Sequence, residues 1–145
     1  MSQRHVLEIR RTFAAPPERV FDAFRDPTLL KAWAAPDEHR NEKVEQDFRV
    51  GGAYRREMRF PDGSLQVLLG VFREIDPPHR LVYTYRWETL PMPETLVEID
   101  LVETSEGTEL RLVHSGFPDQ GFADGHDGGW RECFHRLEGI LGGAP

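Results

Sequence analysis

The sequence predicts an α+β fold in which a curved antiparallel sheet wraps around a long C-terminal helix, with the element order β-α-α-β6-α. First, apolar residues recur at every second position over much of the stretch from Glu42 to His114, as in strands joined by short turns. Second, the end of the chain carries an apolar stripe with helical spacing, formed by Trp130, Phe134, Leu137 and Leu141. Because only this last helix is long enough to cover the apolar face of the sheet, we expect the sheet to curve around it.

The first third of the chain predicts one strand and two short helices. Loose alternation from His5 to Phe13 indicates the strand, and Pro16-Pro17 opens a helix with an apolar face made by Val20, Phe21 and Phe24. Asp26 is suited to cap a second helix, which begins at Pro27 and buries Leu29, Leu30 and Trp33. The proline at this junction predicts a bent pair of helices rather than one rod.

The middle of the chain predicts an antiparallel meander with one buried face. Val50-Gly51-Gly52 and Pro61-Asp62-Gly63 bracket one strand, and Leu65 to Ile75 returns from it as far as the break at Asp76-Pro77-Pro78. Glu106-Gly107 turns the chain into the last strand. The apolar faces of the three later strands carry Leu81, Tyr83, Tyr85 and Trp87, then Val97, Ile99 and Leu101, then Leu110 and Leu112.

Length and composition predict the class of protein and exclude several partners. At 145 residues the chain is expected to form one domain, residues 1–145. Its net charge of -7 argues against nucleic acid and anionic membranes, since both attract positive charge. Cys133 is the single cysteine, so we expect neither an intrachain disulfide nor a thiolate metal cluster. The start of the chain lacks the apolar core of a signal peptide, which predicts a cytoplasmic protein.

Four segments in fixed order carry a resemblance to a known superfamily: Phe13–Phe21, Arg49–Gly52, Pro77–Trp87 and Gly129-Trp130. With them the chain resembles the SRPBCC (START-like, helix-grip) superfamily, and within it the C-terminal domain of the activator of heat-shock-protein-90 ATPase. The resemblance runs from about Arg11 to Leu141. It implies the helix-grip fold, also described as birch-pollen-allergen-like, with a cavity between the sheet and the final helix. Members of one fold bind very different ligands, so the resemblance implies no particular one.

The concave face of the predicted sheet is the candidate binding site. Its side chains either fill a solid core or line an internal cavity, and their number of rigid aromatic rings favours a cavity that takes an apolar or aromatic ligand. The glycine-rich segment from Asp119 to Gly129 is expected to remain flexible and to form the entrance. The predicted lining residues are Tyr54, Arg56, Met58, Phe60, Tyr83, Tyr85, Trp87, Leu112, His114, Trp130 and Phe134.

Two polar residues fall on the apolar side of their strands. A charged Arg56 on a buried face needs a carboxylate, a ligand anion or an opening to solvent, unless a bulge turns it outward. His114 is either a core histidine with satisfied hydrogen bonds or a polar group at one end of the cavity. Both would suit a ligand with an acidic or hydroxylated end.

No catalytic residue, metal ligand or cofactor site is predicted. Ser64 and Ser115 lack the strand-turn-helix setting of a nucleophile elbow. His126 and His135 are nine positions apart, which does not place them together on one helical face. Gly51-Gly52 is an isolated pair rather than a phosphate-binding loop.

Three functions remain open from the sequence. The first is non-covalent binding of a small hydrophobic or aromatic ligand in the internal cavity. The second is a protein-interaction module, as the resemblance to the ATPase activator implies, which would require a protein partner. A third is an enzyme that acts on a substrate bound in the cavity. The chain is expected to be a monomer or a homodimer.

Overall fold

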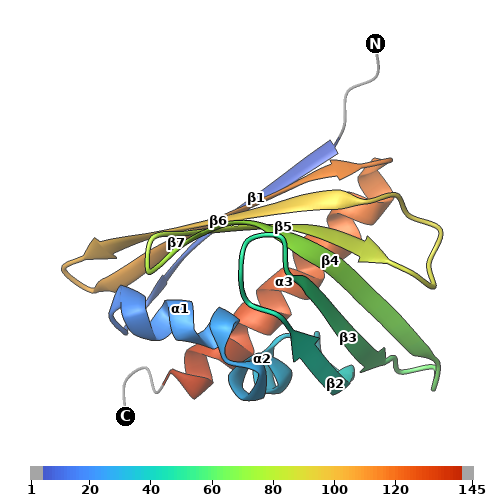
Figure 1. Ribbon diagram of the computed structural model, residues 1–145, viewed down its shortest axis with the longest axis horizontal. Helices are drawn as coiled ribbons and strands as arrows, with labels where there is room; N and C mark the ends of the chain where they lie inside the picture. Colours follow the sequence, from blue (N-terminus) through green and yellow to red (C-terminus); the bar gives the residue numbers. More distant parts are fainter. Residues whose placement is uncertain (1–4, 142–145) are drawn as a thin grey trace.

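The computed structural model describes residues 5–141 and confirms the predicted fold class and element order (Figure 1). One antiparallel sheet has the strand order β1-β7-β6-β5-β4-β3-β2, and the helices lie on its concave side. The elements are β1 (His5–Phe13), α1 (Pro17–Arg25), α2 (Pro27–Trp33), β2 (Arg40–Gln46), β3 (Ala53–Arg59), β4 (Leu65–Asp76), β5 (Arg80–Trp87), β6 (Thr95–Thr104), β7 (Gly107–Phe117) and α3 (Gln120–Ile140). No helix among residues 5–141 is long and apolar enough to cross a bilayer.

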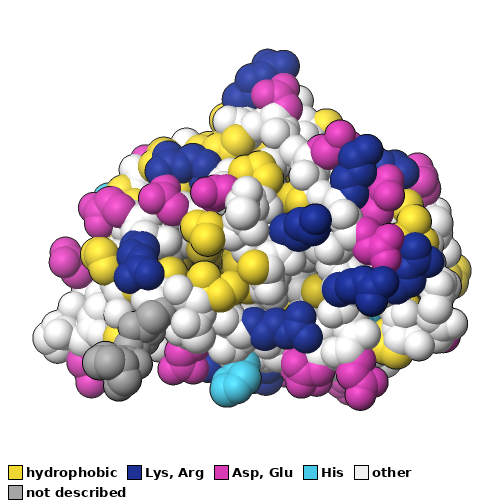
Figure 2. All heavy atoms as spheres, turned by 90° about the horizontal axis from the view of Figure 1, so that it is seen from below, with side chains coloured by type: hydrophobic (Ala, Val, Ile, Leu, Met, Phe, Trp, Pro, Cys, Tyr) yellow, Lys and Arg dark blue, Asp and Glu magenta, His cyan; other side chains and the backbone are white. Residues whose placement is uncertain are grey.

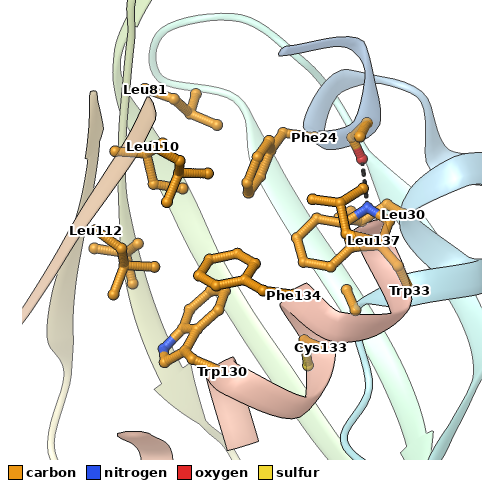
Figure 3. Packing of buried hydrophobic residues seen from close by; sticks show 14 of the residues in the cluster. Phe24, Leu30, Trp33, Leu81, Leu110, Leu112, Trp130, Cys133, Phe134 and Leu137 are labelled. Atoms are coloured by element: carbon orange, nitrogen blue, oxygen red, sulfur yellow. Dashed lines mark hydrogen bonds between the residues drawn. The ribbon is translucent and has the colours of Figure 1, made fainter. Parts of the chain in front are cut away.

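The two short helices form as their end signals predict. Pro17 occupies the first turn of α1, and the Asp26 side chain accepts a hydrogen bond from the Thr28 amide at 2.9 Å at the start of α2. The indole Nε1 of Trp33 donates to the Ala23 carbonyl at 2.9 Å, which ties α2 to α1 inside the core (Figure 3). This bond satisfies the one polar atom of a ring that is almost fully buried.

The second half of α3 fills the concave face of the sheet. Its apolar stripe meets Leu110 and Leu112 on one side and Trp33 on the other (Figure 3). Phe134 stacks on Trp33 with ring centroids 6.0 Å apart and meets the edge of Phe13 at the same distance. The helix is therefore held by tightly packed aromatic side chains rather than by its own propensity.

One buried polar chain joins α3 to three strands. The Trp130 indole Nε1 donates to Nδ1 of His114 at 3.0 Å, which places the imidazole proton on Nε2. Nε2 then donates to the Thr95 hydroxyl at 2.8 Å, and that hydroxyl donates to the Tyr85 carbonyl at 2.9 Å. Burial, with a smaller contribution from neighbouring His126, lowers the pKa of His114 well below its ordinary value. His114 is thus a neutral core histidine with both nitrogens paired.

The glycines before Trp130 were expected to resist helix formation, and that expectation is wrong, because the segment forms the first half of α3. The Asp119 side chain caps the helix by accepting from the Phe122 amide at 2.9 Å. His126 Nδ1 donates to the Phe122 carbonyl at 2.9 Å, and Ala123 is buried against the core. The cap and these tertiary contacts outweigh a propensity cost of about 1 kcal/mol for each glycine.

Replacing Trp130 with alanine is expected to lower the free energy of unfolding by about 3–5 kcal/mol, because a buried ring is lost and His114 Nδ1 loses its donor. Trp130→Phe keeps most of the ring and should recover part of the loss. Urea denaturation measures both variants. A wild-type midpoint for the alanine variant would show that the sheet does not hold α3.

Stability is expected to fall as the solution is acidified below about pH 6.5. Burial lowers the pKa of both His114 and His126 from the ordinary value of 6.5. The unfolded chain therefore takes up protons that the folded chain does not, so stability is full above 6.5 and is lost as the pH falls toward the folded-state values. Urea unfolding at about pH 7.5 and 5.5 measures this loss, and a His114→Gln/His126→Gln variant should lose much less. An equal loss in that variant would contradict the assignment.

Candidate functional site

A cavity of about 480 Å³ lies between the first half of α3 and the inner face of the sheet. Strand β3 contributes Arg56 and Met58 to its wall, and Phe60 follows directly after that strand. Tyr85 and Trp87 come from β5, and the segment after α2 closes another side. The cavity volume falls within the range of about 300–1,000 Å³ that is usual for small-molecule sites.

Glycines line the rim of the cavity on α3. Gly121, Gly125 and Gly128 follow one another at spacings of four and three residues, so they lie on the same side of the helix and form its glycine face, and Gly129 adjoins them. All four line the cavity. A Cβ atom at Gly125 or Gly128 would enter open space, with nothing within 4 Å. Gly128 comes two residues before the inward-facing Trp130, so the glycine face is turned away from the apolar stripe and is exposed at the mouth of the cavity.

Aromatic rings form most of the wall opposite the glycines. Phe60 and Trp87 meet edge to face with centroids 5.6 Å apart, and Tyr85 meets Trp87 at 6.0 Å. His39, from the loop before β2, packs against Phe60 at 4.5 Å. These contacts hold the rings in fixed positions, so the wall is a preformed aromatic surface.

The structure brings six of the eleven predicted residues to the cavity: Arg56, Met58, Phe60, Tyr85, Trp87 and Trp130. The other five were expected to line it but lie in the packed core instead. Leu112 is fully buried beneath the second half of α3, Phe134 belongs to that half and is fully buried itself, and His114 belongs to the polar chain described above. Tyr83 is buried against Tyr54, whose hydroxyl donates to the Thr84 carbonyl at 2.6 Å. The four strand residues point inward, but at positions outside the cavity lining.

Several lining residues lie outside the predicted set, including Ala34, Pro36, His39 and Leu90 from loops and Phe122 and His126 from α3. Loop residues carry no periodic signal that would place them. The helical spacing of the glycines is a signal that could have located the α3 wall. His126 Nε2 accepts from the Trp87 indole at 3.3 Å, so α3 and β5 are joined at the cavity itself.

Three buried or partly buried ionisable groups of the cavity wall, Cys133, Tyr85 and His126, are held neutral. Burial raises the pKa of the Cys133 thiol to about 12 and raises that of the Tyr85 hydroxyl as well. Burial lowers the pKa of His126, against a smaller opposing effect of its bond to Phe122. A thiol with a raised pKa is not an activated nucleophile. Within residues 5–141, no three His, Cys, Asp or Glu side chains come together as a metal-ligand set.

Arg56 is a buried charged residue of the cavity wall, and its side chain points inward. The pairing of β3 with β4 runs without a register shift past Arg56 and Leu68, so no bulge turns the side chain outward. The residue is 6% exposed, its guanidinium lies 5.2 Å above the Tyr54 ring, and its Nε has no hydrogen-bond partner. Among residues 5–141, no carboxylate lies within 4.0 Å of its nitrogens. The carboxylate partner that the sequence left open is therefore absent from this part of the chain.

Comparison with solved structures supports the same architecture. A protein from Chromobacterium violaceum shares 33% identity with a TM-score of 0.88, and the match covers 94% of this chain and 96% of that one. A protein from Rhizobium loti shares 30% identity with a TM-score of 0.81 over 94% and 96% of the two chains. An AHSA1 protein from Silicibacter pomeroyi shares 24% identity, covers 94% and 97%, and has the same fold with a TM-score of 0.84.

Sequence comparison gives the family. No curated protein is significantly similar to the chain. Residues 14–142, in contrast, match the family described as activator of Hsp90 ATPase homolog 1-like protein. This match spans nearly all of the sequence and agrees with the resemblance carried by its motifs. The chain belongs to the activator of Hsp90 ATPase homolog 1-like family.

Proposed function

We propose that the protein binds a small hydrophobic or aromatic molecule in the cavity between α3 and the sheet, without changing it covalently. The observation that carries this proposal is a cavity of about 480 Å³ between α3 and the sheet, beside an aromatic wall. Family membership is consistent with a ligand-binding domain and leaves the ligand open.

The glycines oppose the stability of the helix that contains them. Each glycine in a helix interior costs about 1 kcal/mol relative to alanine. At Gly125 and Gly128 no neighbouring atom would clash with a Cβ, so packing does not require glycine there. An open entrance does explain it, because both glycines are exposed at the rim of the cavity, where side chains would crowd the way in. The cost in helix stability is then the consequence of a binding function.

The position of the glycines also supports a way in. Gly121, Gly125 and Gly128 are exposed to solvent, so the cavity opens along the first half of α3. A ligand entering there would pass bare backbone and reach the rings of Tyr85 and Trp87. Most ligand sites combine such an apolar wall with a few polar groups that fix orientation.

A protein-interaction module is the second candidate function, because the family description names an ATPase activator. On the face of the molecule below the sheet, hydrophobic side chains gather between acidic and basic ones, an arrangement that a protein partner could contact (Figure 2). The large exposed hydrophobic residues, however, are spread over β1, β4, β6 and the turn before β3: Val6, Leu65, Val71, Val102 and Val50. That dispersal gives this candidate less support than the cavity gives the first.

Filling the cavity from β3 is expected to abolish ligand binding. The neutral fluorescent probe N-phenylnaphthylamine should bind wild type near one per chain and quench emission from Trp87 and Trp130, which line the cavity. Met58 is buried in the cavity wall, so Met58→Trp places a larger side chain in the open space and should weaken probe binding at least about tenfold, the effect of about 1.4 kcal/mol. Fluorescence titration measures the affinities.

Leu65→Trp is the matched control, since Leu65 lies on the neighbouring strand β4, is exposed, and does not line the cavity. Its probe affinity should equal that of wild type. Melting curves should show both variants folded. Equal probe binding by wild type and the Met58→Trp variant would place the probe on the surface and favour the interaction module.

A further inference from the structure

We propose that the ligand is a small aromatic carboxylate whose anionic head pairs with Arg56 while its ring lies against the aromatic wall. This inference rests on the proposed binding function and names the chemical class of the ligand. The feature that carries the inference is Arg56, a buried arginine that lines the cavity and has no acidic partner within residues 5–141.

The first step is that Arg56 carries an uncompensated charge. An arginine side chain stays protonated in proteins, and burial of an unpaired charge is strongly unfavourable. The Tyr54 ring stabilises the guanidinium through a cation–π contact at 5.2 Å. That contact supplies no negative charge, and the buried Nε still has no acceptor. The neighbouring arginine Arg55 differs, since it faces the other side of the sheet and pairs with Glu57 and Glu88.

The second step is that nothing nearby can become the counter-charge. The charge of Arg56 acts to lower the pKa of Tyr54, Tyr83, Tyr85 and Cys133. Burial is the larger effect at each of them and raises the pKa instead, so all four remain neutral. None of these four buried neighbours therefore supplies an anion to Arg56. A bound ligand is the available source of one.

The third step concerns the acidic groups of the cavity. Asp124 and Glu132 also line it, but both are exposed and both have other partners. Gln120 Nε2 donates to Asp124 at 2.7 Å, and the Asp37 amide donates to Glu132 at 2.8 Å. They lie at the rim in water, where their effect on an anion is screened, whereas Arg56 lies inside, where charge interactions are stronger.

The shape of the site favours a carboxylate on an aromatic body. A guanidinium binds a carboxylate through two parallel N–H···O bonds, and the Arg56 side chain lines the cavity. Tyr85, Trp87 and Phe60 supply flat apolar surface for a ring. A neutral amide of the same shape would keep the ring contacts and leave the charge unmatched.

The experiment compares naphthoate with its neutral isostere naphthamide, each measured by displacement of N-phenylnaphthylamine. Wild type should bind naphthoate roughly 10- to 100-fold more tightly than naphthamide, the gain expected for charge-assisted hydrogen bonds. Arg56→Met keeps the side-chain length and removes the charge, so the preference should disappear while the neutral probe still binds. Naphthoate should raise the melting temperature of wild type and not that of Arg56→Met.

Arg55→Met is the matched control, because it removes the same charge from the adjacent position on the opposite face. It should keep the full preference for naphthoate. Equal affinity of wild type for the two ligands, a preference that survives in Arg56→Met, or one that disappears in Arg55→Met would each overturn the assignment. If the neutral probe binds wild type but naphthoate shows no preference, only the anionic class fails. If the neutral probe does not bind at all, the proposed function fails with it.

Discussion

The docking of α3 on the concave sheet is the constraint on which the rest of the structure depends. Its second half places Trp130 and Phe134 into the curve of the strands, and the indole of Trp130 fixes the proton position on His114. With that half anchored, the position of the first half is set as well. The first half of α3 then lies beside β3 and β5, and the cavity lies between them. One helix thus both completes the core and leaves the site open.

The residues predicted well from the sequence are those whose signal is local. Period-two alternation gave the strands from β3 to β7, and Asp26 and the following proline marked the start of α2, because these features act on neighbouring backbone groups. The first half of α3 was mispredicted because its glycines oppose a helix locally. The Asp119 cap and the contacts of Ala123 and His126 override that preference, and those contacts exist only in the folded protein.

The sequence predicted which side chains face the inside of the sheet, but not which of them reach the cavity. Strand parity identified Tyr54, Tyr85 and His114 alike as inward-facing, and all three are buried. Which inward residue reaches the cavity depends on where α3 stops filling the sheet, and that is a property of packing between distant segments. His39 and Leu90 lie in loops, where no periodicity reports on burial. The resemblance to the family supplied the helix-grip architecture, which local patterns alone do not specify.

The glycine face of α3 has a consequence for how this site can diverge in evolution. A change that reshapes a binding site usually lowers stability, which limits how many such changes a protein tolerates. At Gly125 and Gly128 the relation is reversed, since most residues favour a helix more than glycine does and the added atoms meet no neighbour. Descendants can therefore gain side chains at the mouth of this cavity while becoming more stable. Selection for stability alone would crowd the entrance to the site.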